Sequence, residues 1–316
     1  MNKQIFFRTD IVKEETNRLG KDLLGVKETK DVIDEIVVHK VKINQKHDLR
    51  IKRKPGVYYT IDFSNLNIHD HETSEKVIKV FSKVLIRLLE SKKVLDKKGT
   101  LIGLGNINIT PDSIGPHTLD NVIVTRHLFV NQLNSNGYSN ISGYSPGVMG
   151  NTGIETKDIV EAIHFTVDAD YIIVIDALAT SDISRINKTI QLTDTGISPG
   201  SGVGNKRKEI SEDTMHVPVI AIGIPTVVDL NTVTLNILDN LYDHLKEKNV
   251  DSKIINLLDE LYNENLVDNL KVSKENLNVD MMVTPKDIDE AVEDLSRILA
   301  AGLDVALHKK LRDAYL

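Results

Sequence analysis

Two aspartates are the residues of this sequence best suited to chemistry. Asp112 follows a glycine turn, and Asp176 directly follows the apolar run of residues 171–175. Because functional groups of an open parallel sheet collect beyond the carboxyl ends of its strands, the fold could bring the two side chains face to face. Two carboxylates in contact cannot both ionise cheaply, so such a pair shares one proton. The pair then offers a base to activate water and an acid to polarise a carbonyl group, as direct peptide hydrolysis requires.

Each aspartate also has a plainer interpretation. An aspartate in the first turn of a helix, or at the end of a strand, usually has a structural role. The same carboxylates with a histidine nearby could instead hold a metal ion. The sequence has no H-E-x-x-H motif, and His127 and His164 are isolated histidines of the kind that more often pack or cap. The residues alone leave these roles open.

The segment around Asp112 predicts a strand, a tight turn and a helix. Residues 100–104 are apolar, the turn reads G-L-G-N, and Thr110-Pro111-Asp112 follows. Thr110 can cap a helix with its hydroxyl, and Pro111 suits the first helical position, where no N–H is needed. Asp112 would then lie near the positive end of the helix dipole. Asn106, in the turn, is a candidate binding residue.

A second glycine-rich stretch becomes basic at its end. Residues 199–208 read PGSGVGNKRK and lack the spacing of a P-loop or of a dinucleotide-binding fingerprint. They indicate a mobile loop over a cleft at least as strongly as they indicate a phosphate-binding loop. Ser201 lacks the context of a nucleophile elbow. Lys206 and Arg207 are candidate binding residues for acidic groups of a substrate, although a run of charges is solvated by default.

The composition excludes several classes of function. The chain has 316 residues, 41% of them hydrophobic, enough for one large domain or two small ones. Its net charge of −7 argues against binding nucleic acid through the phosphates. The absence of cysteine excludes disulfides, thiolate metal sites and a cysteine nucleophile. No run approaches the ~18 apolar residues of a membrane span and the start lacks a signal peptide, so we expect a soluble, cytosolic protein.

Strands alternate with helices along much of the chain. Strands are predicted at residues 57–63, 100–104, 171–175, 189–192 and 217–222. Helices are predicted at residues 74–95, 157–167, 231–246, 252–263 and 285–308, the last with Thr284 as cap and Pro285 at its first position. The first 46 residues are highly charged and show no strong period. The pattern predicts an α/β fold with a mainly parallel sheet, helices on both faces and additional C-terminal helices.

Several stretches of the chain form long, specific motifs. They are GLGNINITPDSIGP at 103–116, VTRHLF at 124–129, GVMGNTGIET at 147–156, IVIDALAT at 173–180, TIQLTDTGISPGSGVGNKRKEI at 189–210, VPVIAIGIPTVVD at 217–229 and MMVTPKDIDEAVEDLSRILAAGLDVALH at 281–308. Together they resemble the germination proteases of spore-forming bacteria, which degrade small acid-soluble spore proteins when the spore germinates. The resemblance covers nearly the whole chain and is weakest at residues 11–100 and 230–278.

The resemblance implies a fold similar to that of the hydrogenase maturation endopeptidases, which have a loop similar to residues 103–115. In those relatives the residues matching Asp112 and Asp176 bind a metal. In the germination proteases the same two positions are the proposed catalytic residues of an atypical aspartic endopeptidase. We find no match for the relatives' metal-binding histidine, so we expect neither a metal nor another cofactor. The resemblance also implies a homotetramer in the cytoplasm of the spore core.

The start of the chain, FRTDIVKEE, resembles the processing region of the same family. These proteases are made as inactive precursors that remove their own N-terminal segment, cutting after an acidic residue that a large apolar and then a small residue follow. Asp10-Ile11-Val12 fits this order, with Val12 larger than usual. We therefore expect cleavage between Asp10 and Ile11. Residues 1–10 would be a propeptide and residues 11–316 a single peptidase domain, helical from about 231 to 316.

The expected partners follow from the same resemblance. They are small acid-soluble spore proteins as substrates and further copies of this chain, with no direct nucleic-acid binding and no membrane. The alternative is a metal-dependent peptidase, or a metal-binding maturation-type protein, that uses Asp112 and Asp176 as ligands.

Overall fold

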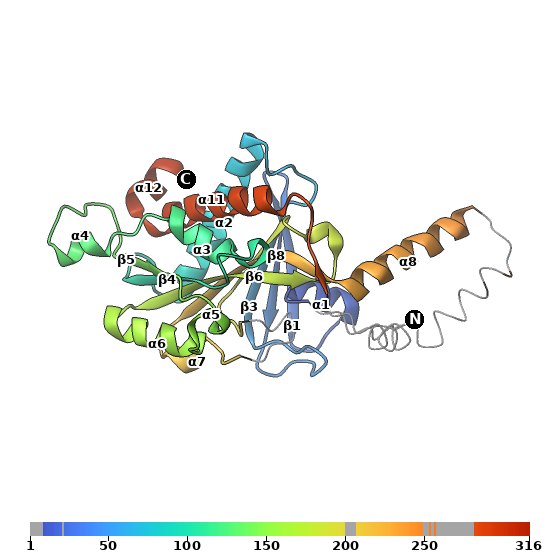
Figure 1. Ribbon diagram of the computed structural model, residues 1–316, viewed down its shortest axis with the longest axis horizontal. Helices are drawn as coiled ribbons and strands as arrows, with labels where there is room; N and C mark the ends of the chain where they lie inside the picture. Colours follow the sequence, from blue (N-terminus) through green and yellow to red (C-terminus); the bar gives the residue numbers. More distant parts are fainter. Residues whose placement is uncertain (1–8, 21, 200–206, 249–252, 254–255, 257–280) are drawn as a thin grey trace.

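The fold is built on one mixed β-sheet (Figure 1). The computed structural model describes residues 9–20, 22–199, 207–248, 253, 256 and 281–316. These residues form a sheet of nine strands in the order β1-β2-β3-β7-β8-β6-β4-β5, with β9 paired to β8. The strands are β1 Val26–Ile33, β2 Ile36–Ile43, β3 Gly56–Asp62, β4 Gly99–Gly103, β5 Ile141–Tyr144, β6 Tyr171–Thr180, β7 Thr189–Thr193, β8 Val219–Asp229 and β9 Met282–Val283.

One half of the sheet is parallel and the other half is antiparallel. β5, β4, β6 and β8 pair in parallel, whereas β8, β7, β3, β2 and β1 pair antiparallel. The predicted α/β class is confirmed, and both aspartates of interest belong to the parallel half. β1, β2, β5 and β9 were not predicted from the sequence. The edge strand β1 is exposed along most of its length and carries charged side chains, so it has no apolar alternation.

Helices cover both faces of this sheet (Figure 1). They are α1 Val12–Leu19, α2 His71–Ser91, η1 Thr110–Asp112, α3 Ile114–Asn121, α4 Arg126–Val130, α5 Met149–Thr152, α6 Thr156–Val167, η2 Ile183–Arg185, α7 Glu212–Met215, α8 Leu230–Glu247, α11 Ile288–Leu307 and α12 Lys309–Tyr315. The helices predicted at residues 74–95, 157–167 and 231–246 are confirmed as α2, α6 and α8. Within the described part of the chain, no helix has the length and apolar character needed to cross a membrane.

The C-terminal part differs in detail from the prediction. α11 begins at Ile288 with Asp287 as its N-cap residue, so the predicted start at Pro285 is wrong. Thr284 does not cap the helix, because β9 pairs with β8 and brings its hydroxyl 2.8 Å from the Thr226 carbonyl oxygen, to which it donates. α11 packs on α2 and α3, whereas α8 projects away from the sheet (Figure 1). The predicted helix at 252–263 lies outside the described residues, apart from two helical positions, 253 and 256.

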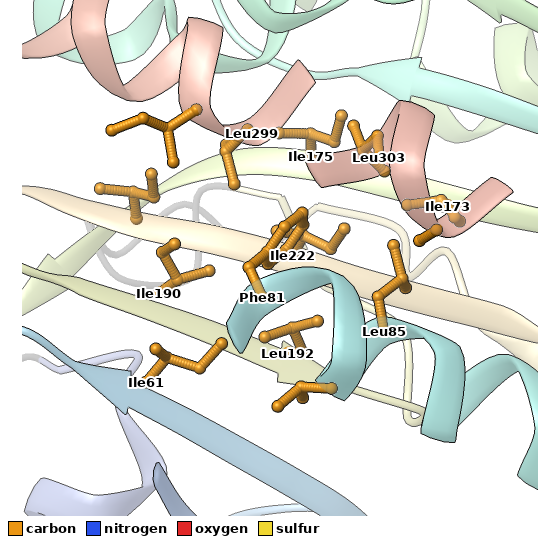
Figure 2. Packing of buried hydrophobic residues seen from close by; sticks show 14 of the residues in the cluster. Ile61, Phe81, Leu85, Ile173, Ile175, Ile190, Leu192, Ile222, Leu299 and Leu303 are labelled. Atoms are coloured by element: carbon orange, nitrogen blue, oxygen red, sulfur yellow. The ribbon is translucent and has the colours of Figure 1, made fainter. Parts of the chain in front are cut away.

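The main core lies between the sheet and the helices α2 and α11 (Figure 2). Phe81 of α2, Ile175 of β6 and Leu299 of α11 are completely buried there. α2 presents a continuous apolar stripe because its apolar residues recur every three or four positions. Asp70 caps this helix by accepting a hydrogen bond from the Thr73 N–H at 3.1 Å.

The opposite face of the sheet carries two smaller clusters. One lies under α6 and α7 and consists of Ile102, Leu104, Val160, Ile172, Val174, Ile210, Met215 and Val219. The other lies under α1 and consists of Val12, Leu23, Val41, Ile43, Ile51 and Tyr58. Because successive residues of a strand point to opposite faces, both clusters lie across the sheet from the main core.

The pairing of β6 with β8 contains a bulge. Leu178 pairs with Pro225 and Ala179 pairs with Val227, so Thr226 is an extra residue in β8. A proline has no N–H to donate to a strand ladder, and a bulge is one of the places in a sheet that tolerates it.

Removal of one buried ring tests the position of the main core. We expect Phe81→Ala to lower the free energy of unfolding by about 3–5 kcal/mol, because it removes buried apolar surface and leaves a cavity. Phe165→Ala is the matched control, since the Phe165 side chain on α6 is 88% exposed. It should change stability by no more than about 0.5 kcal/mol. Urea unfolding measures both, and equal effects would contradict this core.

Candidate active site

The loop after β4 holds Asp112 through main-chain contacts. Asp112 Oδ2 accepts a hydrogen bond from the Asn106 N–H at 2.9 Å. Gly105 has a φ of 111°, and a Cβ at this position would lie 1.8 Å from the Asp112 carbonyl oxygen, so only glycine fits the turn. From β8, Thr226 Oγ1 donates to the Pro111 carbonyl oxygen at 2.6 Å. The carboxylate of Asp112 is therefore held by its own loop and by a neighbouring strand.

The same loop is attached directly to β6. Leu104 donates its N–H to the Ile175 carbonyl oxygen at 2.8 Å. Gly115 approaches so closely that a Cβ there would lie 2.3 Å from the Leu104 carbonyl oxygen and 2.6 Å from that of Ile175. Since Asp176 follows Ile175, this contact brings the Asp112 loop beside Asp176.

The local structure around Asp112 differs from the predicted helix start. Thr110–Asp112 form the single 3₁₀ turn η1, and α3 begins only at Ile114. Thr110 is not the cap, because Ile109 occupies that position. The Asp112 carboxylate bonds back to Asn106, and Ser113 Oγ donates to the Thr110 carbonyl oxygen at 2.8 Å. These local bonds compete with a continuous helix, so the loop rather than a helix dipole positions Asp112.

Asp176 lies within a strand, and the prediction that the strand ends at this residue is wrong. β6 continues to Thr180 because β8 pairs with it from Ile172 to Thr180. β4 does end at Gly103, opposite Ile175, so Asp176 lies just beyond the end of that neighbour. Ile175 faces the main core, and Asp176 therefore points to the opposite face, where it is 6% exposed.

The electrostatics couple the two carboxylates. Burial raises the pKa of Asp112, although the Asn106 N–H and the charge of Arg207 oppose the shift. The pKa of Asp176 is raised well above its ordinary value, first by burial and then by the charges of Asp112 and Asp10. The Ala177 N–H, which donates to Asp176 Oδ1 at 3.0 Å, opposes this only in part. The charge of Asp112 is therefore one of the causes that oppose the ionisation of Asp176.

The N-terminal segment reaches the same place. Asp10 donates its N–H to the Ala179 carbonyl oxygen at 2.8 Å, and the Ala179 N–H donates to Asp10 Oδ2 at 2.9 Å. The Asp10 carboxylate is near enough to Asp176 for its charge to raise the Asp176 pKa. Ile11 and Val12, which follow, are completely buried. Asp10, the first residue of the predicted cleavage bond, therefore lies near Asp176.

Two of the three predicted binding residues lie next to Asp112. Asn106 contacts Asp112 through its main-chain N–H, while its side-chain oxygen accepts from the Asn108 N–H at 3.1 Å. Arg207 is near enough to lower the Asp112 pKa, and among the described residues its Nη1 finds no hydrogen-bond partner. Lys206 lies outside the described residues.

Gln191 of β7 is a polar residue of this region that was not predicted from the sequence. Gln191 pairs with Gly223 of β8, and Gly223 pairs with Asp176, so the three residues form a row across the sheet. The signal was present in T-I-Q-L-T, residues 189–193, where strict alternation places one polar face opposite the core. A strand was predicted there, but its polar face was not considered as part of a site.

Side chains close enough together to hold a metal ion form one group in the described part of the chain. This group comprises His69, Glu290 and Asp294, and His69 Nδ1 lies 2.6 Å from Asp294 Oδ2. Neither Asp112 nor Asp176 belongs to it. The described residues thus place no histidine with the aspartate pair to complete a set of three metal ligands.

Comparisons with known proteins give a consistent result. The sequence model of the germination protease family matches residues 5–258 and 246–315. A germination protease of Bacillus cereus (strain B4264) is 37% identical over 96% of this chain and 94% of its own length. One from Geobacillus sp. (strain WCH70) is 38% identical over 88% and 84%, and one from Bacillus pumilus (strain SAFR-032) is 36% identical over 96% and 91%.

Among solved structures, the chain is similar to a NiFe hydrogenase maturation protease from Thermococcus kodakarensis KOD1. The TM-score is 0.33 and the identity 11%, over 70% of this chain and 98% of that one. The family assignment rests on the sequence matches, which extend over nearly the whole chain at more than one third identity. The chain therefore belongs to the germination protease family and is an endopeptidase.

Proposed function

We propose that Asp112 and Asp176 hydrolyse the peptide bond as a pair that shares one proton. The observation that carries this proposal is electrostatic: burial raises the pKa of both carboxyls, and the charge of Asp112 raises that of Asp176 further. With the proton on Asp176, Asp112 is the base that activates water. Asp176 is the acid that polarises the scissile carbonyl.

The proposed steps balance without a covalent intermediate. Ionised Asp112 takes a proton from water as the water oxygen bonds to the carbonyl carbon, and Asp176 gives its proton to the carbonyl oxygen. In the second step the Asp112 proton passes to the amide nitrogen while the C–N bond breaks. One hydroxyl proton of the intermediate returns to Asp176. The products are a carboxylic acid and an amine, and the pair regains its starting state.

The substrates we propose are small acid-soluble spore proteins, cut in the cytoplasm of the spore core by a homotetramer. Family membership supports this proposal. Arg207, close to Asp112, together with Lys206 would bind acidic groups of the substrate, and Asn106 would hold the Asp112 carboxylate in place. The net charge of −7 is consistent with a protein that makes no direct contact with nucleic acid.

A metal-dependent peptidase, or a metal-binding maturation-type protein, is the second candidate. It would use Asp112 and Asp176 as ligands, and two carboxylates are a suitable start for such a site. The proton-sharing proposal is favoured because, among the described side chains, no histidine joins these two carboxylates in a group of possible ligands.

Amide variants of the pair test the proposal. Asp112→Asn and Asp176→Asn should each lower the rate of cleavage of a small acid-soluble spore protein by roughly 10²–10⁴-fold, because each removes one partner of the acid–base pair. Mass spectrometry of the fragments measures the rate. Asp168→Asn is the matched control, since the Asp168 side chain is 91% exposed and pairs with Lys98. It should cleave like the wild type.

The same assay separates the two mechanisms. Under the proton-sharing proposal, wild-type protein treated with a chelator keeps its rate, and elemental analysis finds no stoichiometric metal. Loss of cleavage on chelation, with recovery on adding a divalent cation, would favour the metal-dependent peptidase. Unchanged cleavage by either Asn variant would contradict both mechanisms, because both use the two aspartates.

The raised pKa of Asp176 also predicts how stability depends on pH. Above the ordinary aspartate value of 3.8 the unfolded chain loses this proton while the folded protein keeps it, so stability falls as pH rises toward the raised pKa. Asp176→Asn removes this titration. The variant should therefore gain stability relative to the wild type by up to about 1.4 kcal/mol per pH unit in this window. Urea unfolding at several pH values measures the difference, and a difference independent of pH would contradict a proton on Asp176.

We also propose that residues 1–10 are a propeptide that the protein removes itself, leaving residues 11–316 as the peptidase domain. The Asp10 carboxylate supports cleavage in this segment, because it is near enough to Asp176 for its charge to raise the Asp176 pKa. The burial of Ile11 and Val12 supports a segment that is bound and not free.

The cleavage bond has a direct test. After incubation, N-terminal sequencing of the shortened wild-type chain should begin at Ile11, because Asp10 lies near Asp176 and precedes the predicted cleavage bond. Asp112→Asn and Asp176→Asn should keep the full-length N-terminus under the same conditions. A first residue other than Ile11 in the shortened wild type would refute this assignment.

A further inference from the structure

The Gln191 side chain contacts the main chain of the N-terminal segment on both sides of Ile11. Gln191 Nε2 donates to the Asp10 carbonyl oxygen at 2.8 Å, and Gln191 Oε1 accepts from the Val12 N–H at 2.8 Å. Gln191 is 7% exposed, so both hydrogen bonds lie in a largely dry environment. Because the amide contacts only peptide groups, it can bind chains of different sequence in one register.

The sheet places Gln191 opposite Asp176. Gln191 pairs with Gly223 and Gly223 pairs with Asp176, and residues paired in this way project to the same face. Two strand spacings separate Gln191 from Asp176, or about 10 Å. Gly223, between them, has no side chain, and a Cβ there would lie 2.5 Å from the Leu178 side chain. The Leu178 side chain therefore covers Gly223 at the centre of the row, with the Gln191 amide on one side and the Asp176 carboxyl on the other.

Further contacts hold the segment along this row. Arg53 Nη2 donates to the Thr9 carbonyl oxygen at 2.5 Å, and the Ile11 N–H donates to Thr9 Oγ1 at 3.0 Å. Together with the bonds between Asp10 and Ala179, they define the path of the main chain up to the predicted cleavage bond. A pocket of about 230 Å³ adjoins this path and is lined in part by Asp10 and by Gln191 of β7.

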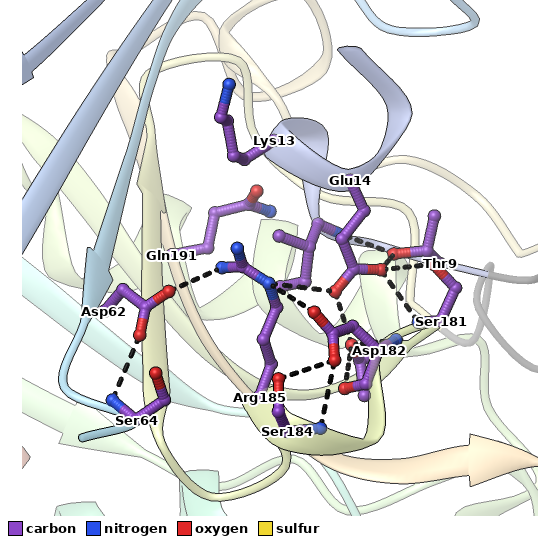
Figure 3. A network of polar contacts seen from close by, with 12 residues as sticks. Thr9, Lys13, Glu14, Asp62, Ser64, Ser181, Asp182, Ser184, Arg185 and Gln191 are labelled. Carbon is purple, nitrogen blue, oxygen red and sulfur yellow. Dashed lines mark hydrogen bonds and ion pairs between the residues drawn. The ribbon is translucent and has the colours of Figure 1, made fainter. Parts of the chain in front are cut away.

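A separate network anchors the start of α1 (Figure 3). The Glu14 carboxylate accepts hydrogen bonds from Thr180 Oγ1 at 2.5 Å, from Ser181 Oγ at 2.6 Å and from the Ser181 N–H at 2.8 Å. Arg185 lies beside it, 3.7 Å from Glu14 Oε1. These bonds hold α1 together with the bond from the Val12 N–H, the first of the helix, to Gln191 Oε1. The other bond of Gln191, from Nε2, reaches the carbonyl oxygen of the predicted cleavage bond.

We infer that Gln191 is a positioning residue that holds the scissile peptide bond against the aspartate pair, an inference that rests on the proposed function. Its Nε2 donates to the carbonyl oxygen of that bond, and its Oε1 accepts from the N–H two residues further along the substrate. Negative charge develops on this carbonyl oxygen as water adds. The Nε2–H···O bond therefore strengthens in the transition state. In this proposal the main chain of residues 10–12 makes the contacts with Gln191 that a substrate would make.

Two substitutions of Gln191 test separately the donor Nε2 and the acceptor Oε1 of its amide. Gln191→Met removes both groups at similar size and should lower the first-order rate of self-cleavage of the full chain by about 10²–10³-fold at every pH. Gln191→Glu keeps the shape and the acceptor. It should be as slow as the Met variant while the new carboxylate is ionised, and should recover at low pH, where a protonated carboxyl again donates. A purely structural role would not produce this recovery.

The charged groups around the carboxylate of the Gln191→Glu variant determine the pH at which its cleavage rate recovers. The charged groups that line this region are Asp10, Lys52, Arg53, Lys54 and Glu209, with Asp176 across Gly223. Their contribution is measured by comparing the full pH profiles of the wild type and the two variants. Circular dichroism melts verify that each variant is folded.

Thr189→Val is the matched control. Thr189 lies on the same strand and face, is completely buried, and its hydroxyl has no hydrogen-bond partner among the described residues. This variant should cleave at the wild-type rate. A spore-protein substrate added in trans gives a second readout that does not depend on self-cleavage.

The outcomes distinguish a failure of the role inferred for Gln191 from a failure of the proposed function. Folded Gln191→Met and Gln191→Glu proteins that cleave within about threefold of the wild-type rate would overturn the role of Gln191. A loss of cleavage rate in Gln191→Glu that stays the same at every pH would also overturn this role. If Asp112→Asn and Asp176→Asn also keep cleaving, the proposed function itself fails. If those two are inactive while the Gln191 variants are active, only the inference about Gln191 is wrong.

Discussion

The close contact between the loop of residues 103–116 and strand β6 is the constraint on which the site depends. Leu104 bonds to the Ile175 carbonyl oxygen, and Gly115 lies against both residues with no space for a Cβ. Any side chain at Gly115 would move the loop away from β6 and separate the two carboxyl groups. Main-chain packing, made possible by glycine, is thus what brings Asp112 to Asp176.

This packing has an electrostatic cost that the fold tolerates. Asp176 is buried on the face opposite the main core, and the charges of both Asp112 and Asp10 oppose its ionisation. The large apolar core under α2 and α11 lies on the other face of the same strand, where Ile173 and Ile175 are completely buried. One face of β6 therefore contributes to stability, and its other face holds a carboxyl group whose ionised form is destabilised.

The sequence was most informative where a physical signal was local. The apolar run before Asp176 and the glycines around residue 105 predicted two strands and a turn, and the structure contains them. The end of β6 could not be predicted, because it depends on pairing with β8 over residues distant in sequence. The helix start at Thr110 was mistaken because the Asp112 carboxylate bonds to Asn106 in place of a helix terminus. The amide of Gln191 carried no motif, since its position opposite Asp176 is a property of strand order alone.

The extra residue in β8 links the sheet to the Asp112 loop in one further way. Thr226 is the residue by which β8 exceeds β6 in register, and it is also the donor to the Pro111 carbonyl oxygen next to Asp112. A deletion at this point would restore an even ladder, but it would remove that donor. The irregularity of β8 therefore supports the loop that carries Asp112.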